Sequence, residues 1–388
     1  MNPNDKNDAQ GASLSHRFIE PLDVLFLRGN KLFGDPGSHG ESLVPPWPSA
    51  AAGALRSRIL ADDGTDLVAF AQGKIVHPSL GTPEAPGDFA VTAFDVARRL
   101  PDGTVQTLHP VPADLVLGEG DTSDRITVRR AQPVTPTSGL LSSSPLAQWP
   151  VLPQEGRAKP VGGRWLTQIG WSAYLAGKTP DADQFVKTAD LWQIDPRVGV
   201  GLDSETRRAA DGQLFTVQAV AFRSGVGFLA SVQGAPLPPA GLLRLGGDGR
   251  GAVLDLAKTY RPSLPDWAAL ARARRCRVVL TTPGLFAAGW ALPGFDETTQ
   301  RVTLPGLSAR LVCAAVPRAE TISGWDLANQ RPKPAERVAP SGSVYWLDEL
   351  ETTPEALRNL AVRGLWPDGA DNASRRAEGF NRFTLAVF

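Results

Sequence analysis

The chain has 388 residues, 42% of them hydrophobic and 21% charged, which excludes a disordered or fibrous protein and allows large buried cores. Its 40 basic and 40 acidic side chains cancel. This balance excludes the strongly basic type of nucleic-acid-binding protein, although local basic patches can still set a binding field. The length predicts roughly two to three domains.

The sequence shows no targeting signal and no metal-binding motif. Residues 1–14 contain no apolar signal core, and no run approaches the roughly 18 apolar residues of a membrane span. The two cysteines, Cys276 and Cys313, lie in apolar runs away from any histidine, which indicates buried reduced thiols rather than a zinc site. We therefore expect a soluble, cytoplasmic protein without a metal or another cofactor.

The first half of the chain predicts strands around one main helix. Residues 1–15 form a polar tail that we expect to be disordered. The mostly apolar run 18–27 predicts a buried strand, and the small-residue run 50–60 predicts a helix capped by Ser49. Further patterns are strand-like at 73–76, 89–92, 104–107, 214–221, 227–233 and 252–256, helical or mixed at 165–177, a short helix at 238–245 and a glycine-rich turn at 246–251.

The first half also contains a Pro-, Ser- and Gly-rich insertion near 131–163, and the second half repeats the theme with weaker helices. Its strand-like runs are 276–281, 301–304, 309–316, 343–347 and 383–388, and a helix over 354–360 begins with proline. This order predicts an α+β protein of two tandem ferredoxin-like (RRM-like) domains with long loop insertions. The domains would span residues 16–258 and 264–388.

Residues 195–216 predict a hairpin that projects from the first domain. A polar loop carrying Arg207 and Arg208 lies between two apolar runs, and Gly212 would release the chain into the second strand. Cations at the end of a rigid hairpin are suited to single-stranded RNA, where phosphate neutralisation combines with base stacking or splaying. A polar surface hairpin is the alternative.

The sequence of this hairpin resembles a known family. Arg197-Val-Gly-Val-Gly-Leu-Asp203, followed by Thr206-Arg207 and Asp211-Gly-Gln-Leu-Phe-Thr216, is similar to the projecting loop of the RAMP proteins of CRISPR effector complexes. The closest similarity is to the third-subunit family of the Cmr, or type III-B, complex. Further motifs in the order of that family are Ile19-Glu-Pro-Leu-Asp-Val-Leu-Phe-Leu-Arg28, Pro45-Pro-Trp-Pro-Ser49, Ala52-Gly-Ala-Leu-Arg56, Leu245-Gly-Gly-Asp-Gly-Arg250, Thr282-Pro283 with Gly289-Trp290, Ile322-Ser-Gly-Trp-Asp-Leu327, Ser341-Gly-Ser-Val-Tyr-Trp346 and Gly379-Phe380.

The resemblance implies a non-catalytic RNA-binding subunit of an antiviral ribonucleoprotein. Such a subunit holds the 5′ handle of the CRISPR RNA and consists of two tandem RRM-like folds. Its implied partners are the large Cas10-type polymerase/cyclase subunit and the first backbone RAMP subunit, and it meets target RNA only indirectly. The resemblance also implies that a glycine-containing C-terminal loop, here residues 363–382, lies next to the RNA.

Cationic side chains in these motifs are the predicted RNA-binding residues: Arg28, Lys31, His39, Arg56, Arg130, Arg164, Arg197, Arg207, Arg208, Arg250, Arg375 and Arg376. Arg56 is preferred to Arg58 because it ends the Gly-Ala-Leu-Arg motif. The turn at 246–251 could cradle a phosphate or simply be a tight turn. Three tryptophans are stacking candidates, although core or interface positions suit them better: Trp165, Trp325 and Trp346.

Other functions stay open at this point. An endonuclease that processes precursor CRISPR RNA would need a general acid–base group near a 2′-hydroxyl, and His39 could serve. A scaffold without RNA contact is a further alternative. The glycine-rich turn is not followed by lysine at the spacing of a nucleotide-hydrolysing loop, and we assign no catalytic residue.

Overall fold

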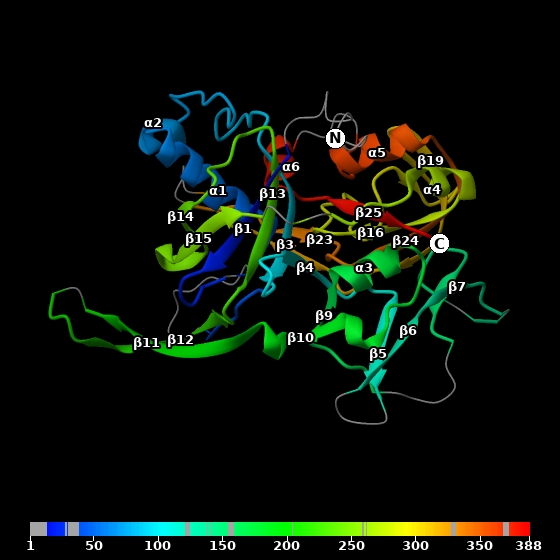
Figure 1. Cartoon of the computed structure of the whole chain (residues 1–388), viewed down its shortest axis with the longest axis horizontal. Helices are drawn as coiled ribbons and strands as arrows, with labels where there is room; N and C mark the ends of the chain where they lie inside the picture. The colour runs from blue at the N-terminus through cyan, green and yellow to red at the C-terminus, as the bar shows by residue number, and fades with distance from the viewer. Residues whose placement is uncertain are drawn as a thin grey trace.

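The computed structural model describes residues 14–27, 29, 39–120, 125–137, 139–140, 142–153, 159–203, 205–257, 260, 262–326, 331–367 and 372–388. Two main sheets lie side by side, and a long hairpin extends away from them (Figure 1). Neighbouring strands in both sheets are antiparallel, and few helices accompany them. The predicted α+β class is confirmed.

The first sheet contains eight strands and carries helix α1 on one face. Its central strand β13 has seven buried residues of eight, which explains the unbroken apolar run in the sequence. Small residues such as Ala51 and Ala52 are fully buried, so α1 can approach the sheet closely. In spatial order the strands are β10 (Phe185–Lys187), β9 (Arg164–Thr167), β4 (Val105–Pro110), β3 (Ala90–Arg99), β13 (Val226–Gln233), β1 (Ser15–Pro21), β15 (Gly251–Leu256) and β14 (Gly241–Arg244), and α1 spans Pro48–Asp62.

The second sheet contains six strands and packs against two helices. Helix α5 begins as predicted, because the side chain of Thr353 accepts from the amide of Ala356 and Pro354 takes the first helical position. In spatial order the strands are β17 (Phe295–Asp296), β18 (Arg301–Leu304), β19 (Leu307–Ala315), β24 (Val344–Thr352), β16 (Cys276–Leu280) and β25 (Phe383–Ala386), and the two helices are α4 (Trp267–Ala273) and α5 (Pro354–Arg363). The remaining helix of this half, α6 (Ala373–Glu378), contacts α1 and β3 instead.

Smaller elements complete the fold. The projecting hairpin consists of β11 (Trp192–Leu202) and β12 (Ala209–Phe222), and β2 (His39–Gly40) adds to it. The remaining helices and 3-10 turns are α2 (Leu67–Ala71), α3 (Gln168–Leu175), η1 (Ala182–Gln184), η2 (Thr188–Asp190) and η3 (Gly247–Gly249). Four two-stranded ribbons are β5 (Leu115–Glu119) with β6 (Ile126–Arg130), β7 (Gln132–Val134) with β8 (Trp149–Val151), β20 (Glu320–Ile322) with β23 (Glu336–Val338), and β21 (Trp325–Asp326) with β22 (Arg331–Pro332).

The short helix expected at 238–245 is wrong, because this segment forms the edge strand β14. Leu242 is exposed whereas Leu243 is buried, which is the alternation of a strand with one face on the core. Residues 73–76, expected as a strand, form no strand and follow directly after α2. Both segments are short, so the local hydrophobic pattern alone does not determine their secondary structure.

Two element boundaries also differ from the prediction. The strand expected over 18–27 ends at Pro21, and Leu25 instead bridges to Val220 of the hairpin. Helix α1 begins at Pro48 with Trp47 as its N-cap, so Ser49 is a helical residue and not the cap. The chain therefore leaves the first sheet at Pro21 and turns toward the base of the hairpin.

A hydrophobic cluster joins the two halves of the molecule. The first half contributes residues around α3, and the second half contributes residues of its sheet. Two of the tryptophans discussed above are buried in cores, as their sequence context favoured, since Trp165 is 7% exposed and Trp346 is 1% exposed. The fully buried members of this joining cluster include Leu166, Tyr174, Val279, Cys313, Val344 and Trp346.

A buried ion pair lies in the same interface. The Arg277 guanidinium, on β16, donates to the Asp114 carboxylate at 2.5 Å and to the carbonyl oxygens of Tyr174 and Val387. The Tyr174 hydroxyl donates to the other Asp114 oxygen at 2.7 Å, and burial raises the pKa of Tyr174 well above its usual value. Arg277 and Asp114 are 1% and 0% exposed, so each of these buried charges depends on the other and on these hydrogen bonds.

Both cysteines lie where the sequence placed them. Cys276 is on β16 and Cys313 on β19, both are buried free thiols, and burial raises the pKa of each to about 12. Such thiols stay protonated at neutral pH and are poor nucleophiles. Across the described ranges, no helix is long and apolar enough to cross a membrane.

Candidate RNA-binding surface

The structure gathers the predicted site residues in four places. His39, Arg197 and Arg250 lie around the base of the hairpin, and Arg207 and Arg208 lie at its tip. A third group, which contains Arg56, Arg375 and Arg376, lies where α1 meets α6. A fourth group, which contains Arg130 and Arg164, lies beside the insertion. Arg28 and Lys31 lie outside the described residues.

One segment, residues 39–56, connects two of these places, the hairpin base and the group where α1 meets α6. Its β2 pairs in parallel with β12, and the Ser42 hydroxyl donates to the Gln218 carbonyl oxygen at 2.5 Å. Trp47 then packs against Trp366 and Phe380 of the second half. Arg56 follows on α1, so the segment runs from the hairpin base to the C-terminal motif.

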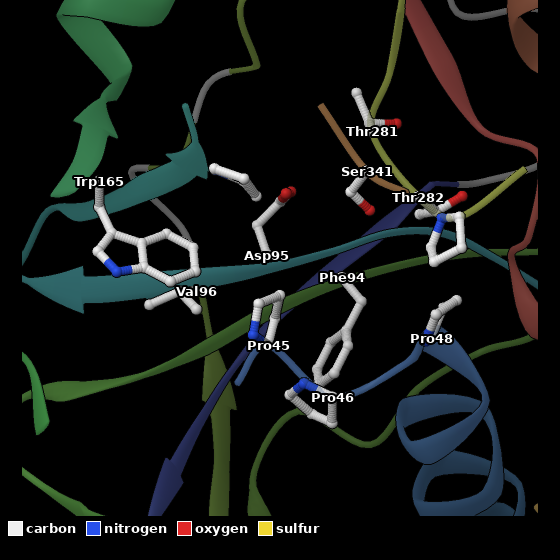
Figure 2. A pocket seen from close by; sticks show the side chains of 12 residues that line it. Pro45, Pro46, Pro48, Phe94, Asp95, Val96, Trp165, Thr281, Thr282 and Ser341 are labelled. Atoms are coloured by element: carbon white, nitrogen blue, oxygen red, sulfur yellow. The ribbon is translucent and has the colours of Figure 1, made fainter. Parts of the chain in front are cut away.

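A narrow cleft between the two halves opens along this segment (Figure 2). It brings together three motifs that are far apart in the sequence, the Pro-Pro-Trp-Pro run, Thr282-Pro283 and the start of the Ser341 motif. Asp95 on β3 points into it, and one Asp95 carboxylate oxygen lies 3.6 Å from Nδ1 of His109. The lining residues are Pro45, Pro46, Pro48, Phe94, Asp95, Val96, Pro110, Trp165, Thr281, Thr282, Pro283 and Ser341.

Beside the cleft, α1 and α6 bring arginines together whose donors are not all used. The guanidinium of Arg56 lies 5.0 Å from the centre of the Phe89 ring, and that of Arg376 lies 5.7 Å from the Trp366 ring. Nε and Nη2 of Arg56 are buried without a hydrogen-bond partner in the described part of the chain. The same holds there for Nε of Arg376 and of Arg382, although Arg382 Nη1 donates to the Val362 carbonyl oxygen.

Burial without an acceptor among the described residues disfavours the charged form of these guanidinium groups. Burial, followed by the charge of Arg376, lowers the pKa of Arg382 to about 10. Burial also lowers the pKa of Arg56, while Glu378 acts in the opposite direction. A buried donor without an acceptor costs free energy, and an anion with several oxygens, such as a phosphate, removes that cost. The arrangement is therefore suited to bind a phosphate group.

Arg375 has a different environment from its neighbour. It is 5% exposed, and its guanidinium bonds to Glu336 at 2.6 Å and to Glu378 at 3.0 Å. Both carboxylates already accept from its donors, and Glu378 is also bound by Lys333 at 2.7 Å. Arg375 thus fixes α6 against β23, whereas Arg376 retains an unused donor.

Helix α6 was missed in the sequence, where residues 363–382 were expected to be a loop. The side chain of Asn372 caps the helix through the amide of Arg375, and Gly379 ends it in the left-handed conformation. A side chain at Gly379 would also meet the Val91 carbonyl oxygen at 2.8 Å. The motif glycine is therefore required for α6 to approach β3 closely. Arg382 was not predicted, since no local pattern shows that it turns inward.

The hairpin has two chemically different faces. One face is apolar and exposed over most of the hairpin, and the opposite face carries Arg197, Gly199 and Phe215. Arg197 pairs with Asp195 at 2.9 Å on that opposite face. The residues exposed on the apolar face are Ile194, Val198, Val200, Leu202 and Leu214.

The tip of the hairpin is ordered by Asp203. Its carboxylate accepts from the amides of Glu205 and Thr206 and from the Thr206 hydroxyl, and the Thr206 hydrogen bonds lower the pKa of Asp203. Arg207 and Arg208 are exposed beyond this turn. Gly212 lies inside β12 rather than before it, at positive φ where the register with β11 shifts.

The glycine-rich turn packs against the hairpin base. The amide of Gly247 donates to the Phe26 carbonyl oxygen at 2.8 Å, and Arg250 lies 4.9 Å from the centre of the Phe26 ring. Phe26 in turn packs with Val217 and Ala219 of β12. The turn therefore has a packing role, and it also brings Arg250 to the same region as Arg197.

Arg130 and Arg164 do not join these groups. Arg130 donates to the Gly177 carbonyl oxygen at 2.7 Å, and burial followed by the charge of Arg277 lowers its pKa. Arg164 lies on β9 opposite Lys187, near the edge of the first sheet. The Arg130 contact ties the β5–β6 ribbon to the chain just after α3, so it supports the fold rather than the surface described above.

The comparison with known families decides the identity of the chain. A family model described as "CRISPR-associated protein (Cas_Cmr3)" matches residues 17–386. The chain belongs to the Cmr3 family. Membership confirms the resemblance found in the sequence and makes the protein a subunit of a type III-B Cmr effector complex.

Among curated proteins no sequence matches this Cmr3-family chain. Among solved structures, one similar chain comes from "Cryo-EM structure of the Type III-B Cmr-beta bound to cognate target RNA", with 14% identity, a TM-score of 0.44 and coverage of 85% of this chain and 86% of that chain. Another comes from that complex with cognate target RNA and AMPPnP, with 15% identity, a TM-score of 0.48 and coverage of 95% and 98%.

Proposed function

We propose that this Cmr3-family protein is a non-catalytic guide-RNA-binding subunit that anchors the 5′ handle of the CRISPR RNA. The observation that carries the proposal is the group of unused arginine donors at Arg56, Arg376 and Arg382 beside the cleft. RNA supplies phosphates in a row, so it can satisfy this group and still follow residues 39–48 toward the hairpin. The chain would fold as two tandem ferredoxin-like domains with insertions, as the family resemblance implies.

The same proposal includes protein partners. The protein docks the large Cas10-type subunit and the first backbone RAMP subunit, and target RNA reaches it only through them. Support comes from the apolar face of the hairpin, where Val198 is 68% exposed and Leu202 is 63% exposed. A contiguous exposed apolar face of this kind marks a surface that another protein covers. The net charge of zero suits a chain whose surface mostly contacts other proteins and binds RNA along a single groove.

The proposal is tested by titrating the purified full chain into a fluorescent RNA that carries the 5′ handle, with fluorescence anisotropy as the readout. We expect tighter binding than to an RNA of equal length whose handle sequence is scrambled. Equal binding of the two RNAs would contradict handle recognition.

The endonuclease alternative is tested on the same material. Precursor CRISPR RNA is incubated with the wild type and with His39→Ala, and the products are separated on a denaturing gel. We expect intact RNA in both reactions. Cleavage that depends on His39 would overturn the non-catalytic assignment.

The hairpin tip should contribute electrostatically to RNA binding. We predict that Arg207→Ala/Arg208→Ala lowers the slope of log K against log salt by up to about 1.4, because each phosphate contact to a single strand contributes about 0.7. Anisotropy titrations at several salt concentrations measure the slope. The control is Arg272→Ala/Arg358→Ala on α4 and α5, at the opposite end of the molecule (Figure 1). The same change in the control would mean that the effect is not local.

A further inference from the structure

Phe215 lies flat across the backbone of the opposite strand. It pairs directly with Gly199 in the β11–β12 register. A Cβ atom placed on Gly199 would come within 2.3 Å of the Phe215 ring, so only glycine leaves room for the ring there. Gly201 has the same relation to Gln213, whose side-chain oxygen would lie 2.0 Å from such a Cβ. The two glycines of the Val-Gly-Val-Gly motif therefore form a floor for two flat side chains.

The outer side of the Phe215 ring is open. Phe215 is 37% exposed, and among the described residues no other aromatic ring is recorded in contact with it. Figure 1 shows the hairpin extending away from both sheets, with no other element over its outer part. Arg197 stands on the same face, two cross-strand pairs nearer the base.

We propose that Phe215 is a stacking platform for one unpaired nucleobase of the guide RNA. The inference rests on the proposed function and deepens it, because it names the residue and the part of the RNA that meet. An aromatic ring held flat on a glycine floor presents its π-face without losing rotamer freedom on binding. The Gln213 amide lies beside the ring and can hydrogen-bond to a base edge, and Arg197 can reach the adjoining phosphate.

The opposite face of the hairpin does not suit a base. It carries Val198, Val200 and Leu214 and offers neither an aromatic ring nor a cation among its exposed side chains. A protein surface is the better complement there. The asymmetry of the two faces therefore assigns the RNA to the glycine face and a protein to the apolar face.

A purely structural role for Phe215 would be to shield the strand glycines from water. Two substitutions separate the roles. Phe215→Leu keeps an apolar cover over Gly199 but removes the π-face, and Phe215→Tyr keeps both. Circular dichroism and thermal unfolding establish that each variant is folded.

The experiment places 2-aminopurine at successive positions of a guide RNA and measures its fluorescence on binding to the full chain. We expect one position to be quenched by the wild type and by Phe215→Tyr, and to stay bright with Phe215→Leu. Phe215→Leu should also weaken RNA binding by about 5- to 150-fold, the range of one stacked base. The matched control is Leu214→Ala, on the other face of the same strand, which should leave quenching and affinity unchanged.

Three outcomes would overturn the inference. If handle RNA binds but no position depends on Phe215, the platform is refuted while the proposed function stands. If Phe215→Leu leaves RNA binding intact and instead weakens association with a neighbouring subunit in the assembled complex, the ring meets protein. If the chain binds no handle RNA at all, the proposed function fails with it.

Discussion

Replacing Arg277 by methionine should lower the free energy of unfolding by about 3 to 5 kcal/mol, the usual cost of removing one partner of a buried ion pair. The reason is that Asp114, which is 0% exposed, would lose its ion pair with Arg277 and keep the hydrogen bond from the Tyr174 hydroxyl. Urea denaturation followed by tryptophan fluorescence measures the loss. Because the pair joins the two halves, we also expect the unfolding transition to broaden.

The ion pair itself need not be stabilising, and a double variant tests this. In Arg277→Met/Asp114→Leu no buried charge is left without a partner, so much of the lost stability should return. The control for the loss of a cation is Arg272→Met, an exposed position on α4, with an expected change within about 0.5 kcal/mol. If Arg277→Met behaved like this control, the described network would not hold the halves together.

Arg56→Met should weaken binding of handle RNA by about 10- to 100-fold and should leave the protein as stable as before or more stable. A hydrogen bond to a charged group contributes about 1.5 to 3 kcal/mol, and two buried donors of Arg56 have no acceptor among the residues that the structure describes. Their removal breaks no hydrogen bond of these two donors and relieves a buried charge, which offsets the loss of the contact with the Phe89 ring and of the attraction to Glu378. A substitution that weakens RNA binding but does not lower the free energy of unfolding indicates a residue whose role is to bind a ligand. Anisotropy and urea denaturation give the two quantities.

The same helix provides the matched control. Arg58 donates to Asp62 at 2.9 Å and to the Leu242 carbonyl oxygen, so its donors are already used. Arg58→Met should leave RNA affinity unchanged and cost some stability, the reverse of Arg56→Met. Equal loss of affinity in both variants would show only that positive charge on α1 matters, and the specific role of Arg56 would be contradicted.

Local signals in the sequence predicted a good part of the fold. Strand β18 has the predicted bounds, and α5 has the predicted proline start, since hydrophobic alternation and N-terminal proline act within a few residues. The segment at 238–245 was assigned wrongly because its three leucines fit either the helical or the strand period until β15 is seen to pair with it. Such pairing is a long-range fact that one sequence does not contain.

In the candidate site, too, local motifs predicted some features, whereas contacts between distant residues decided others. Motifs placed Arg56 and the Arg375–Arg376 pair near RNA, but only the packing of α1 on α6 shows that they meet. Which arginine of the pair is available depends on Glu336, almost 40 residues away on β23, because it occupies Arg375. Arg382 was missed for a similar reason. Its inward orientation depends on contacts with residues distant in the chain.

We expect arginine to have two separate uses in this molecule, holding its halves together and making the proposed RNA contacts, and ionic strength should distinguish them. The Arg277 contacts to Asp114 and to backbone carbonyls are buried, where dissolved ions screen little. Contacts to RNA phosphates, by contrast, weaken steeply as salt displaces them. Concentrated salt should therefore release bound nucleic acid while the two halves remain joined. A chain with no net charge can thus be freed of its RNA and recovered in its folded form.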